Sequence, residues 1–304
     1  MLKNEIIYSL NKNEADFSAC IKNHSGDENI IYKTFDGQGI SLSIYYPSAF
    51  DKNKKYKTIV FVHGGGWASH KIFDDQKQWS GDHLGFLARY YAQKGFVSVS
   101  VDYRLAREEC QKIGYQLIDL YTDVTDALRF LSERKEQYGI DEKNISILGE
   151  SAGGYLAAAI ATLPYFKQPF SFNKVFLINA ITSLHDYWHK AVPLYTDNIF
   201  QSGDFYITIE LDNKSIEDKT ELLSPVDNIS KSQSEFILIH GLADRCVAPE
   251  QSLNFHKKEL EIGNISKLYW LPDTAHAFLL AEYTSEKLAA ATAVDILNNE
   301  LLYK

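Results

Sequence analysis

The pattern with the most chemical content is G-x-S-x-G at positions 149–153, which has Ser151 at its centre. It directly follows an apolar run at 145–148 and precedes an alanine-rich stretch, the context expected for a sharp turn between a strand and a helix. Such a turn lifts the serine hydroxyl off the sheet and strains the serine backbone, so both flanking residues must be small. The pattern alone also fits a tightly packed glycine turn, but its context favours a nucleophile at Ser151.

A run of three glycines at positions 64–66 follows another apolar run at 58–62. Consecutive glycines are costly in backbone entropy at the end of a buried strand, which indicates that the backbone itself is used there. Attack of a hydroxyl on a carbonyl group creates a negatively charged oxygen, which needs N–H donors already in place. We expect the N–H groups of Gly65, Gly66 and Ala152 to form this oxyanion hole, with Gly64 as the alternative.

A phosphate-binding turn is the competing interpretation of the glycine run. Against it, the run lacks both the G-x-G-x-x-G spacing and the lysine followed by Ser or Thr of a P-loop. We interpret the neighbouring His63 as a scaffold residue that bonds the backbone of the loop. Trp67 fits either a core residue or a wall of a substrate pocket.

A serine nucleophile needs a base to take its proton and a carboxylate to orient that base. His276 and Asp244 are the predicted base and acid, because they follow apolar runs at 267–271 and 236–239, and parallel strands place their ligands at the carboxyl ends. Asp273 competes as the acid, since it lies only three residues before His276. We favour Asp244, because the base needs a partner from a neighbouring strand end that faces its distal nitrogen.

Aromatic side chains could line a compact pocket beside these groups, and we expect Trp67, Tyr155 and Trp188 to do so. His185 and His189 are separated by one helical turn, as in H-E-x-x-H zinc sites, but a third ligand is lacking and a proline follows closely. We therefore expect no metal and no cofactor.

Short apolar runs alternate with longer helical patterns, which predicts an α/β fold: a mostly parallel central sheet flanked by helices on both faces. The predicted strands are nearly continuous in Val, Ile, Leu and Phe, as in strands buried on both faces, and cover residues 58–62, 96–101, 145–148, 174–178, 236–239 and 267–271. Runs at 34–35 and 40–46 could add an antiparallel edge. The predicted helices cover residues 117–131, 155–160, 251–260 and 285–302.

Two segments, 1–32 and 185–222, fit this alternation poorly. Long connections inside a compact domain are usually functional lids or disordered, and the aromatic residues of the second segment favour an ordered lid. We therefore expect a single α/β domain over residues 1–304, with small cap elements from these two segments.

The 304 residues include 31 Lys+Arg and 40 Asp+Glu, a net charge of 31 − 40 = −9. This balance argues against nucleic acid or an anionic membrane as the main partner, because both need clustered basic residues. The three cysteines are widely spaced, which fits a reducing compartment better than a disulfide framework. No apolar stretch of signal-peptide or membrane-spanning length is found. We expect a cytoplasmic protein without membrane insertion that acts on a small molecule, and a homo-oligomer is left open.

Together these patterns resemble the α/β-hydrolase fold and, within it, the hormone-sensitive-lipase-like serine esterases and carboxylesterases. The resemblance extends over residues 40–280 and rests on motifs in the family's order: 63–67, D-Y-R-L-A at 102–106, 149–153, L-S-P at 223–225, 240–247 and H-A-F at 276–278. It implies a triad of Ser151, Asp244 and His276, an oxyanion hole, an acyl-enzyme intermediate and a variable cap. The family often continues D-Y-R-L-A with proline, whereas Arg107 stands here, so this loop departs from the pattern.

Three functions are consistent with these residues. The first is hydrolysis of carboxylic esters of small acyl groups. The second is hydrolysis of an amide or formamide, as in the arylformamidases and some peptidases of this fold, because the same triad would serve. The third is a non-catalytic ligand-binding protein, which is disfavoured because the serine, acid, histidine and glycines are all retained.

Overall fold

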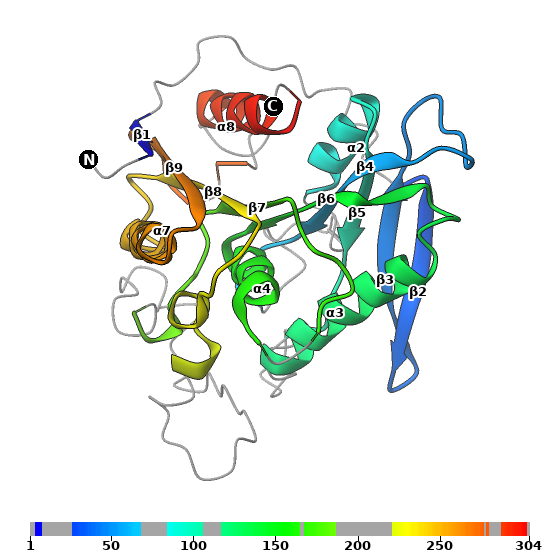
Figure 1. Cartoon of the computed structure of the whole chain (residues 1–304), viewed down its shortest axis with the longest axis horizontal. Coiled ribbons are helices and arrows are strands. Elements are labelled where there is room, and N and C mark those ends of the chain that lie inside the picture. Colours follow the sequence, from blue (N-terminus) through cyan, green and yellow to red (C-terminus); the bar gives the residue numbers. More distant parts are fainter. Residues whose placement is uncertain are drawn as a thin grey trace, which may run out of the picture.

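A nine-stranded sheet runs through the centre of the molecule in the order β1-β9-β8-β7-β6-β4-β5-β3-β2 (Figure 1). The computed structural model describes residues 4–7, 26–67, 84–105, 117–164, 167–186, 221–276, 278–279 and 287–302. The strands are β1 (Glu5–Ile7), β2 (Glu28–Phe35), β3 (Gln38–Tyr45), β4 (Tyr56–Val62), β5 (Val97–Val101), β6 (Ile140–Glu150), β7 (Lys174–Ile178), β8 (Glu235–Gly241) and β9 (Ile265–Leu271). Each apolar run interpreted as a strand therefore forms one.

The first seven strands in this order, β1-β9-β8-β7-β6-β4-β5, pair in the parallel direction. At the other end, β3 pairs with β5, and β2 with β3, in the antiparallel direction. The predicted antiparallel edge is thus confirmed. Because the parallel strands all run the same way, their carboxyl ends lie along one edge of the sheet.

Both faces of the central strands are buried, which explains their nearly continuous apolar sequences. In β4, Val60 and Val62 pack into one apolar cluster, whereas the alternating Ile59 and Phe61 pack into a second. Successive side chains of a strand point to opposite faces. The two clusters are therefore the two layers of core, one on each side of the sheet.

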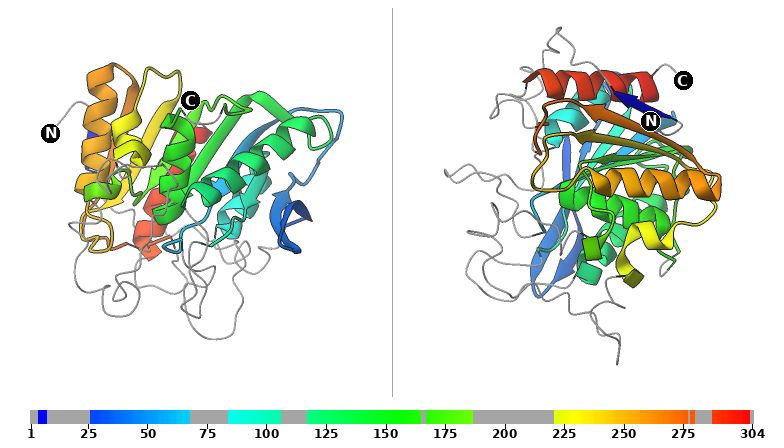
Figure 2. Two further views of the ribbon diagram at one scale, coloured as in Figure 1. Left: turned by 90° about the horizontal axis from the view of Figure 1, so that it is seen from below. Right: turned by 90° about the vertical axis from the view of Figure 1, so that its left-hand side faces the viewer.

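Helices cover both layers, as Figure 2 shows. The first cluster includes side chains of α3 (Leu117–Glu133), α4 (Ser151–Thr162) and α7 (Glu250–Ile262). The second includes side chains of α2 (Gly85–Gln93) and α8 (Lys287–Leu301). The fold is therefore the predicted three-layer α/β arrangement, with helices on both faces.

The helix α2 and the strand β1 were not predicted from the sequence. The buried side chains of α2 do follow helical spacing, at Leu87, Ala88, Tyr91 and Ala92. The three-residue β1 is too short to carry a local signal and forms by pairing with β9 at the sheet edge. Within the segment expected to form a cap, residues 5–7 and 28–32 thus belong to the sheet. Residues 8–25 and 187–220 lie outside the described ranges.

The connections that leave the carboxyl ends of the central strands carry the predicted site. The glycine run follows β4, Ser151 begins α4 directly after β6, and Asp244 and His276 follow β8 and β9. Because β8 and β7 lie between β9 and β6 in the sheet, the loops that carry Asp244 and His276 must fold back toward Ser151 to reach it.

Candidate active site

The turn between β6 and α4 holds Ser151 in a left-handed backbone conformation, with φ +54°. A non-glycine residue in this region is strained, and such strain occurs at functional sites. The two glycines of the motif cannot carry a side chain: a Cβ on Gly149 would lie 2.2 Å from the Gly153 carbonyl oxygen, and one on Gly153 would lie 2.1 Å from that of Val62. The small residues of G-x-S-x-G are thus required by the close approach of β4, β6 and α4.

Ser151, His276 and Asp244 form a continuous hydrogen-bonded line. His276 Nε2 lies 2.8 Å from Ser151 Oγ, and His276 Nδ1 lies 2.6 Å from Asp244 Oδ2. A carboxylate oxygen only accepts, so Nδ1 carries the proton and Nε2 is free to accept the serine hydroxyl proton. The structure therefore brings the three predicted residues together in the order that proton transfer from Ser151 needs.

Asp244, and not the competing Asp273, is the carboxylate that meets His276. Its other oxygen, Oδ1, accepts backbone N–H bonds from Cys246 at 2.8 Å and Val247 at 2.9 Å. These bonds orient the carboxylate before any substrate binds. Asp273 lies exposed on the loop before His276, with φ +51°.

His240 is a further neighbour of the carboxylate and is completely buried. Its Nε2 donates to the carbonyl of Val247 at 3.0 Å and lies 3.4 Å from Asp244 Oδ2, while its Nδ1 accepts from the Ser252 hydroxyl at 2.7 Å. These contacts show that His240 supports the loop that carries Asp244.

The charges of the pair are mutually stabilised. Burial opposes ionisation of Asp244, but hydrogen bonds from His240 and His276 outweigh it and hold the pKa of Asp244 well below its usual range. Burial likewise disfavours a charged imidazole, yet pairing with Asp244 raises the pKa of His276 well above its usual value. Asp244 is therefore ionised at neutral pH, and His276 is made a stronger base.

The glycine loop packs directly against the nucleophile. A Cβ on Gly64 would lie 3.0 Å from the carbonyl oxygen of Glu150 and 3.2 Å from Ser151 Cβ. Gly65 and Gly66 have φ +107° and +62°, which glycine adopts without steric cost. Trp67 closes the loop by donating its indole N–H to the Ala152 carbonyl at 3.0 Å.

Two side chains hold the carbonyl groups of this loop. The His63 Nδ1–H donates to the Gly64 carbonyl at 2.7 Å, and the Tyr103 hydroxyl donates to the His63 carbonyl at 2.6 Å. The two rings stack, with centroids 4.2 Å apart. Because a trans peptide places its N–H opposite its C=O, fixing the Gly64 carbonyl also fixes the direction of the Gly65 N–H. His63 thus makes the backbone contact expected of a scaffold residue.

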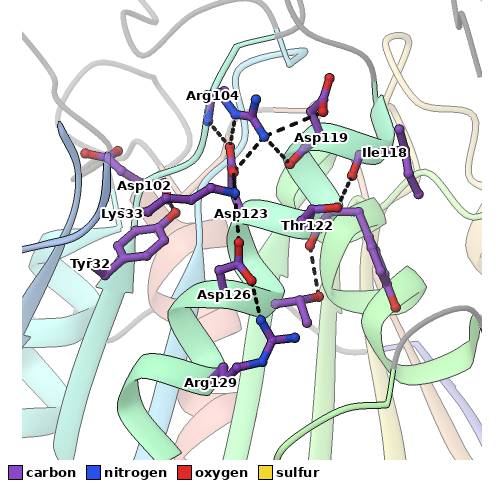
Figure 3. Close-up of polar contacts among 12 residues, drawn as sticks. Tyr32, Lys33, Asp102, Arg104, Ile118, Asp119, Thr122, Asp123, Asp126 and Arg129 are labelled. Carbon is purple, nitrogen blue, oxygen red and sulfur yellow. Dashed lines mark hydrogen bonds and ion pairs between the residues drawn. The ribbon is translucent and has the colours of Figure 1, made fainter. Parts of the chain in front are cut away.

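Tyr103 lies between Asp102 and Arg104, whose contacts with β2 and α3 are drawn in Figure 3. Arg104 donates from Nε at 2.7 Å and from Nη2 at 2.9 Å to the two oxygens of Asp123 on α3, a buried two-point ion pair. Lys33 of β2 bonds the same carboxylate at 2.7 Å, and the Tyr32 hydroxyl donates to the Asp102 carbonyl at 2.7 Å. The Tyr32 hydroxyl of β2 and the Asp123 carboxylate of α3 therefore hold the segment that supports the glycine loop, and Lys33 holds that carboxylate in turn. Ala106 and Arg107 of the same motif lie outside the described residues.

The predicted pocket residues are placed only in part. Trp67 and Tyr155 meet edge to face, with ring centroids 5.4 Å apart, and the Tyr155 hydroxyl donates to the Leu223 carbonyl at 3.0 Å. Both rings are almost fully buried beside the nucleophile turn. Trp188 lies outside the described ranges, as does His189, which was compared above with a zinc ligand.

One residue at this edge of the sheet was missed. Asn179 follows β7 directly, is completely buried and contacts the loops of both Asp244 and His276 through its side chain. A polar residue at the carboxyl end of a parallel strand is a signal for such a site. The sequence does not say which loops the side chain meets, because that depends on the strand order.

Three features together define an α/β-hydrolase fold: the order of the strands, the strained serine turn, and the serine, histidine and aspartate at the strand ends. A solved structure, the native form of a thermophilic esterase from Thermogutta terrifontis, shares it with a TM-score of 0.71 and 23% identity, covering 92% of this chain and 94% of that one. Comparison with protein families matches residues 42–259 to BD-FAE. The chain belongs to the BD-FAE family.

Curated relatives match a shorter segment. Arylacetamide deacetylase from Bos taurus is 35% identical over 140 residues, which cover 45% of this chain and 32% of the relative. Carboxylesterase NlhH from Mycobacterium tuberculosis is 34% identical over 131 residues, which cover 42% of this chain and 36% of the relative. The matched segment thus spans about a third of the length of these relatives. These likenesses agree with the resemblance noted from the sequence motifs.

Proposed function

We propose that this chain is a serine carboxylesterase that hydrolyses esters of small acyl groups through an acyl-enzyme intermediate. The observation that carries the proposal is the hydrogen-bonded line from Ser151 through His276 to Asp244, lying directly beside a loop of three glycines. A hydroxyl, a base with the right tautomer and an orienting carboxylate are the parts that acyl transfer needs.

In the first half of the reaction, His276 Nε2 takes the proton of Ser151 as Oγ attacks the ester carbonyl carbon. The carbonyl π-electrons move onto oxygen, which becomes the oxyanion of a tetrahedral intermediate. The bond to the alkoxy group then breaks, His276 returns its proton to the leaving alcohol, and the acyl group stays on Ser151. Asp244 stays ionised and stabilises the imidazolium that exists between these two proton transfers.

In the second half, His276 takes a proton from water as the water oxygen attacks the acyl-enzyme. The new tetrahedral intermediate collapses with Ser151 as leaving group, and His276 returns the proton to Oγ. One ester and one water thus give one acid and one alcohol, and the enzyme regains its starting protonation.

We assign the oxyanion hole to the N–H groups of Gly65, Gly66 and Ala152. The held carbonyl of Gly64, the positive φ angles of both glycines and the position of Ala152 in the first turn of α4 support this assignment. The first N–H groups of a helix have no partner within the helix and attract negative charge. Each such donor is typically worth about 10²–10³ in kcat.

Short acyl chains are the proposed substrates. The Thermogutta terrifontis esterase has also been solved with butyrate bound, and Trp67, Tyr155 and Trp188 are the proposed walls of the acyl pocket here. Amide or formamide hydrolysis would use the same triad, and the relatives include an arylacetamide deacetylase as well as a carboxylesterase. We place the ester first because the solved structural neighbour is also an esterase. Hydrolysis rates of an acetyl ester and the matching acetamide compare the two directly.

The location of the protein is part of the proposal. Within the described ranges, no helix is both long and apolar enough to cross a bilayer. The acidic charge and few cysteines favour a cytoplasmic enzyme that acts on a small molecule. Cell fractionation checks the location, and light scattering of the purified protein checks whether it forms a homo-oligomer.

The decisive test is Ser151→Ala, assayed with p-nitrophenyl acetate. Removing the nucleophile should lower kcat by a factor on the order of 10⁶ and abolish labelling by a fluorophosphonate probe. Ser98→Ala is the matched control, because Ser98 is a buried serine that lies inside β5 and takes no part in the hydrogen-bonded line. Hydrolysis by folded Ser151→Ala at the wild-type rate would reject the proposal. A wild-type protein that neither labels nor hydrolyses esters would instead support a non-catalytic binding protein.

A further inference from the structure

The loop that carries His276 has to cross two strand ends to reach Ser151. His276 follows β9 and Ser151 follows β6, and the sheet order β9-β8-β7-β6 puts β8 and β7 between them. Neighbouring strands are about 4.8 Å apart, so the crossing spans roughly 14 Å. A hydrogen bond of 2.8 Å at the far end of such a crossing needs the loop to be held along the way.

Asn179 lies on this path, at the end of β7. Its side-chain NH2 donates to the main-chain carbonyl of His276, and its side-chain oxygen accepts the N–H of Gly241 at 3.0 Å. Its own main-chain N–H donates to the Ile239 carbonyl at 3.0 Å, which continues the ladder between β7 and β8. The residue is completely buried.

The partners determine the orientation of this amide. A carbonyl can only accept and an N–H can only donate, so only one of the two amide flips satisfies both contacts. Gly241 ends β8, three residues before Asp244. One short side chain therefore bonds the start of the acid loop and the residue proposed as the base.

The acid and base loops also pack on each other. The N–H of Ala243 donates to the Thr274 carbonyl at 3.0 Å, and a Cβ on Gly241 would lie 2.2 Å from that same carbonyl oxygen. The two loops thus form one packed unit above the ends of β8 and β9. The side chain of Asn179 bonds this unit to β7, the strand next to the one that ends at the nucleophile.

We propose that Asn179 is a positioning residue that sets the reach of the His276 imidazole toward Ser151 by holding the His276 main chain to the end of β7. The inference rests on the proposed esterase function, because it gives Asn179 a role only through the base. Its side chain touches neither the nucleophile nor the imidazole nitrogens in the contacts above, so its effect on the reaction is through position.

The residue type fits this task in two ways. Asn179 has φ +44°, a left-handed conformation that asparagine tolerates better than most non-glycine residues. Its amide also offers a donor and an acceptor on two separate atoms, which neither a carboxylate nor a hydroxyl does. Aspartate would keep the size and the acceptor but, when ionised, lose the donor to His276.

Two variants test the role. Asn179→Gly keeps the positive φ and removes both side-chain bonds. Asn179→Asp keeps the shape and the acceptor but, when ionised, replaces the donor with a charged acceptor. We expect kcat for p-nitrophenyl acetate to fall about 10- to 100-fold in both, because a displacement of about 1 Å at reacting groups costs on that order. KM should change less than about twofold, since the acyl pocket is untouched. The rate constant of fluorophosphonate labelling should fall in parallel with kcat.

The matched control is Asn264→Gly. Asn264 is also a buried amide whose donor and acceptor are both used, by the Ser230 carbonyl at 2.8 Å and the Ser232 N–H at 3.0 Å in one neighbouring loop. It lies before β9, at the opposite edge of the sheet. Its loss should lower the melting temperature and leave kcat within about twofold, because lost buried hydrogen bonds cost stability and not geometry at the site.

Folded Asn179 variants with wild-type kcat would overturn the inference, and so would a loss in kcat that Asn264→Gly reproduces. If Asn179→Gly does not fold, the isosteric Asn179→Asp decides. Failure of the esterase proposal is a separate outcome, because it would appear in the wild-type protein as absence of both hydrolysis and labelling.

Discussion

Oδ2 of Asp244 lies 2.6 Å from Nδ1 of His276, although 32 positions separate the two residues in the chain. Two backbone N–H groups hold the other oxygen of this carboxylate. The carboxylate is therefore fixed before it meets the imidazole, and it decides which ring nitrogen carries the proton.

Asp244→Asn should lower kcat for p-nitrophenyl acetate by about 10⁴, because the amide leaves the imidazole in the wrong tautomer with the geometry otherwise kept. KM should stay close to the wild-type value. Steady-state kinetics of the two proteins measure the change.

Asp273→Asn is the control for this prediction. Asp273 is exposed, and the imidazole of His276 bonds Asp244 instead. We expect Asp273→Asn to keep kcat within about twofold of the wild type, as for most exposed substitutions. A large loss in Asp273→Asn together with an active Asp244→Asn would reverse the assignment of the acid.

The pH dependence of kcat/KM should carry the signature of the raised pKa of His276. The base works in its neutral form, so activity is lost as the pH falls through this pKa, and the acid limb should lie above the ordinary histidine value of about 6.5. In Asp244→Asn the pairing is gone and burial still disfavours the charged ring, so the limb should move to lower pH. Profiles of both proteins, measured from pH 5 to 9, would contradict this assignment if their acid limbs coincided.

Tyr103→Phe should lower kcat by about tenfold with little change in KM. The substitution removes the donor to the His63 carbonyl and leaves that buried carbonyl with one bond fewer, a loss of about 1–3 kcal/mol that falls on the glycine loop. The oxyanion donors act in the transition state, so their loss of alignment should lower kcat and leave the affinity for substrate nearly unchanged.

Tyr91→Phe is the matched control, because Tyr91 is a fully buried tyrosine of α2 whose hydroxyl makes no hydrogen bond within the described residues. Removing that hydroxyl should leave kcat unchanged and the melting temperature equal or higher. Equal kcat losses in both variants would argue that Tyr103→Phe acts by destabilising the whole protein and not by misaligning the glycine loop.

Glu259 should make the stability depend on pH. Burial raises the pKa of this fully buried carboxyl to about 7, against the opposing hydrogen bond from Asn264 and the charge of Lys231. The folded protein then holds a proton that the unfolded chain has released above about pH 4.5, so the free energy of unfolding falls as the pH rises from 4.5 to 7. The loss amounts to about 3 kcal/mol and is complete above pH 7.

Urea denaturation at pH 5 and pH 8 measures this effect. Glu259→Gln should remove most of the pH-dependent difference, whereas Glu261→Gln, an exposed neighbour on α7, should keep it. The prediction would be contradicted if the free energy of unfolding fell by the same amount between the two pH values in wild type and in Glu259→Gln.

Much of the fold follows from local sequence. The apolar runs of β4, β5, β7, β8 and β9 are recognisable because strands buried on both faces need apolar side chains on both. The α/β-hydrolase fold expected from these runs and their motifs is confirmed. By contrast β1 forms only by pairing with β9, and α2 is a short helix without a side-chain cap, so neither has a strong local signal.

The amino-acid sequence by itself determined the serine turn and the glycine loop, because a strained angle or a close backbone approach restricts the residue types within a few positions. Only the tertiary structure decided which groups meet. The neighbours of each strand determine three contacts: Asp244 reaches His276, Tyr103 holds the glycine loop, and Asn179 bonds the loops of both Asp244 and His276. Strand order is set by packing of the whole sheet between its helices, and no short stretch of residues contains that information.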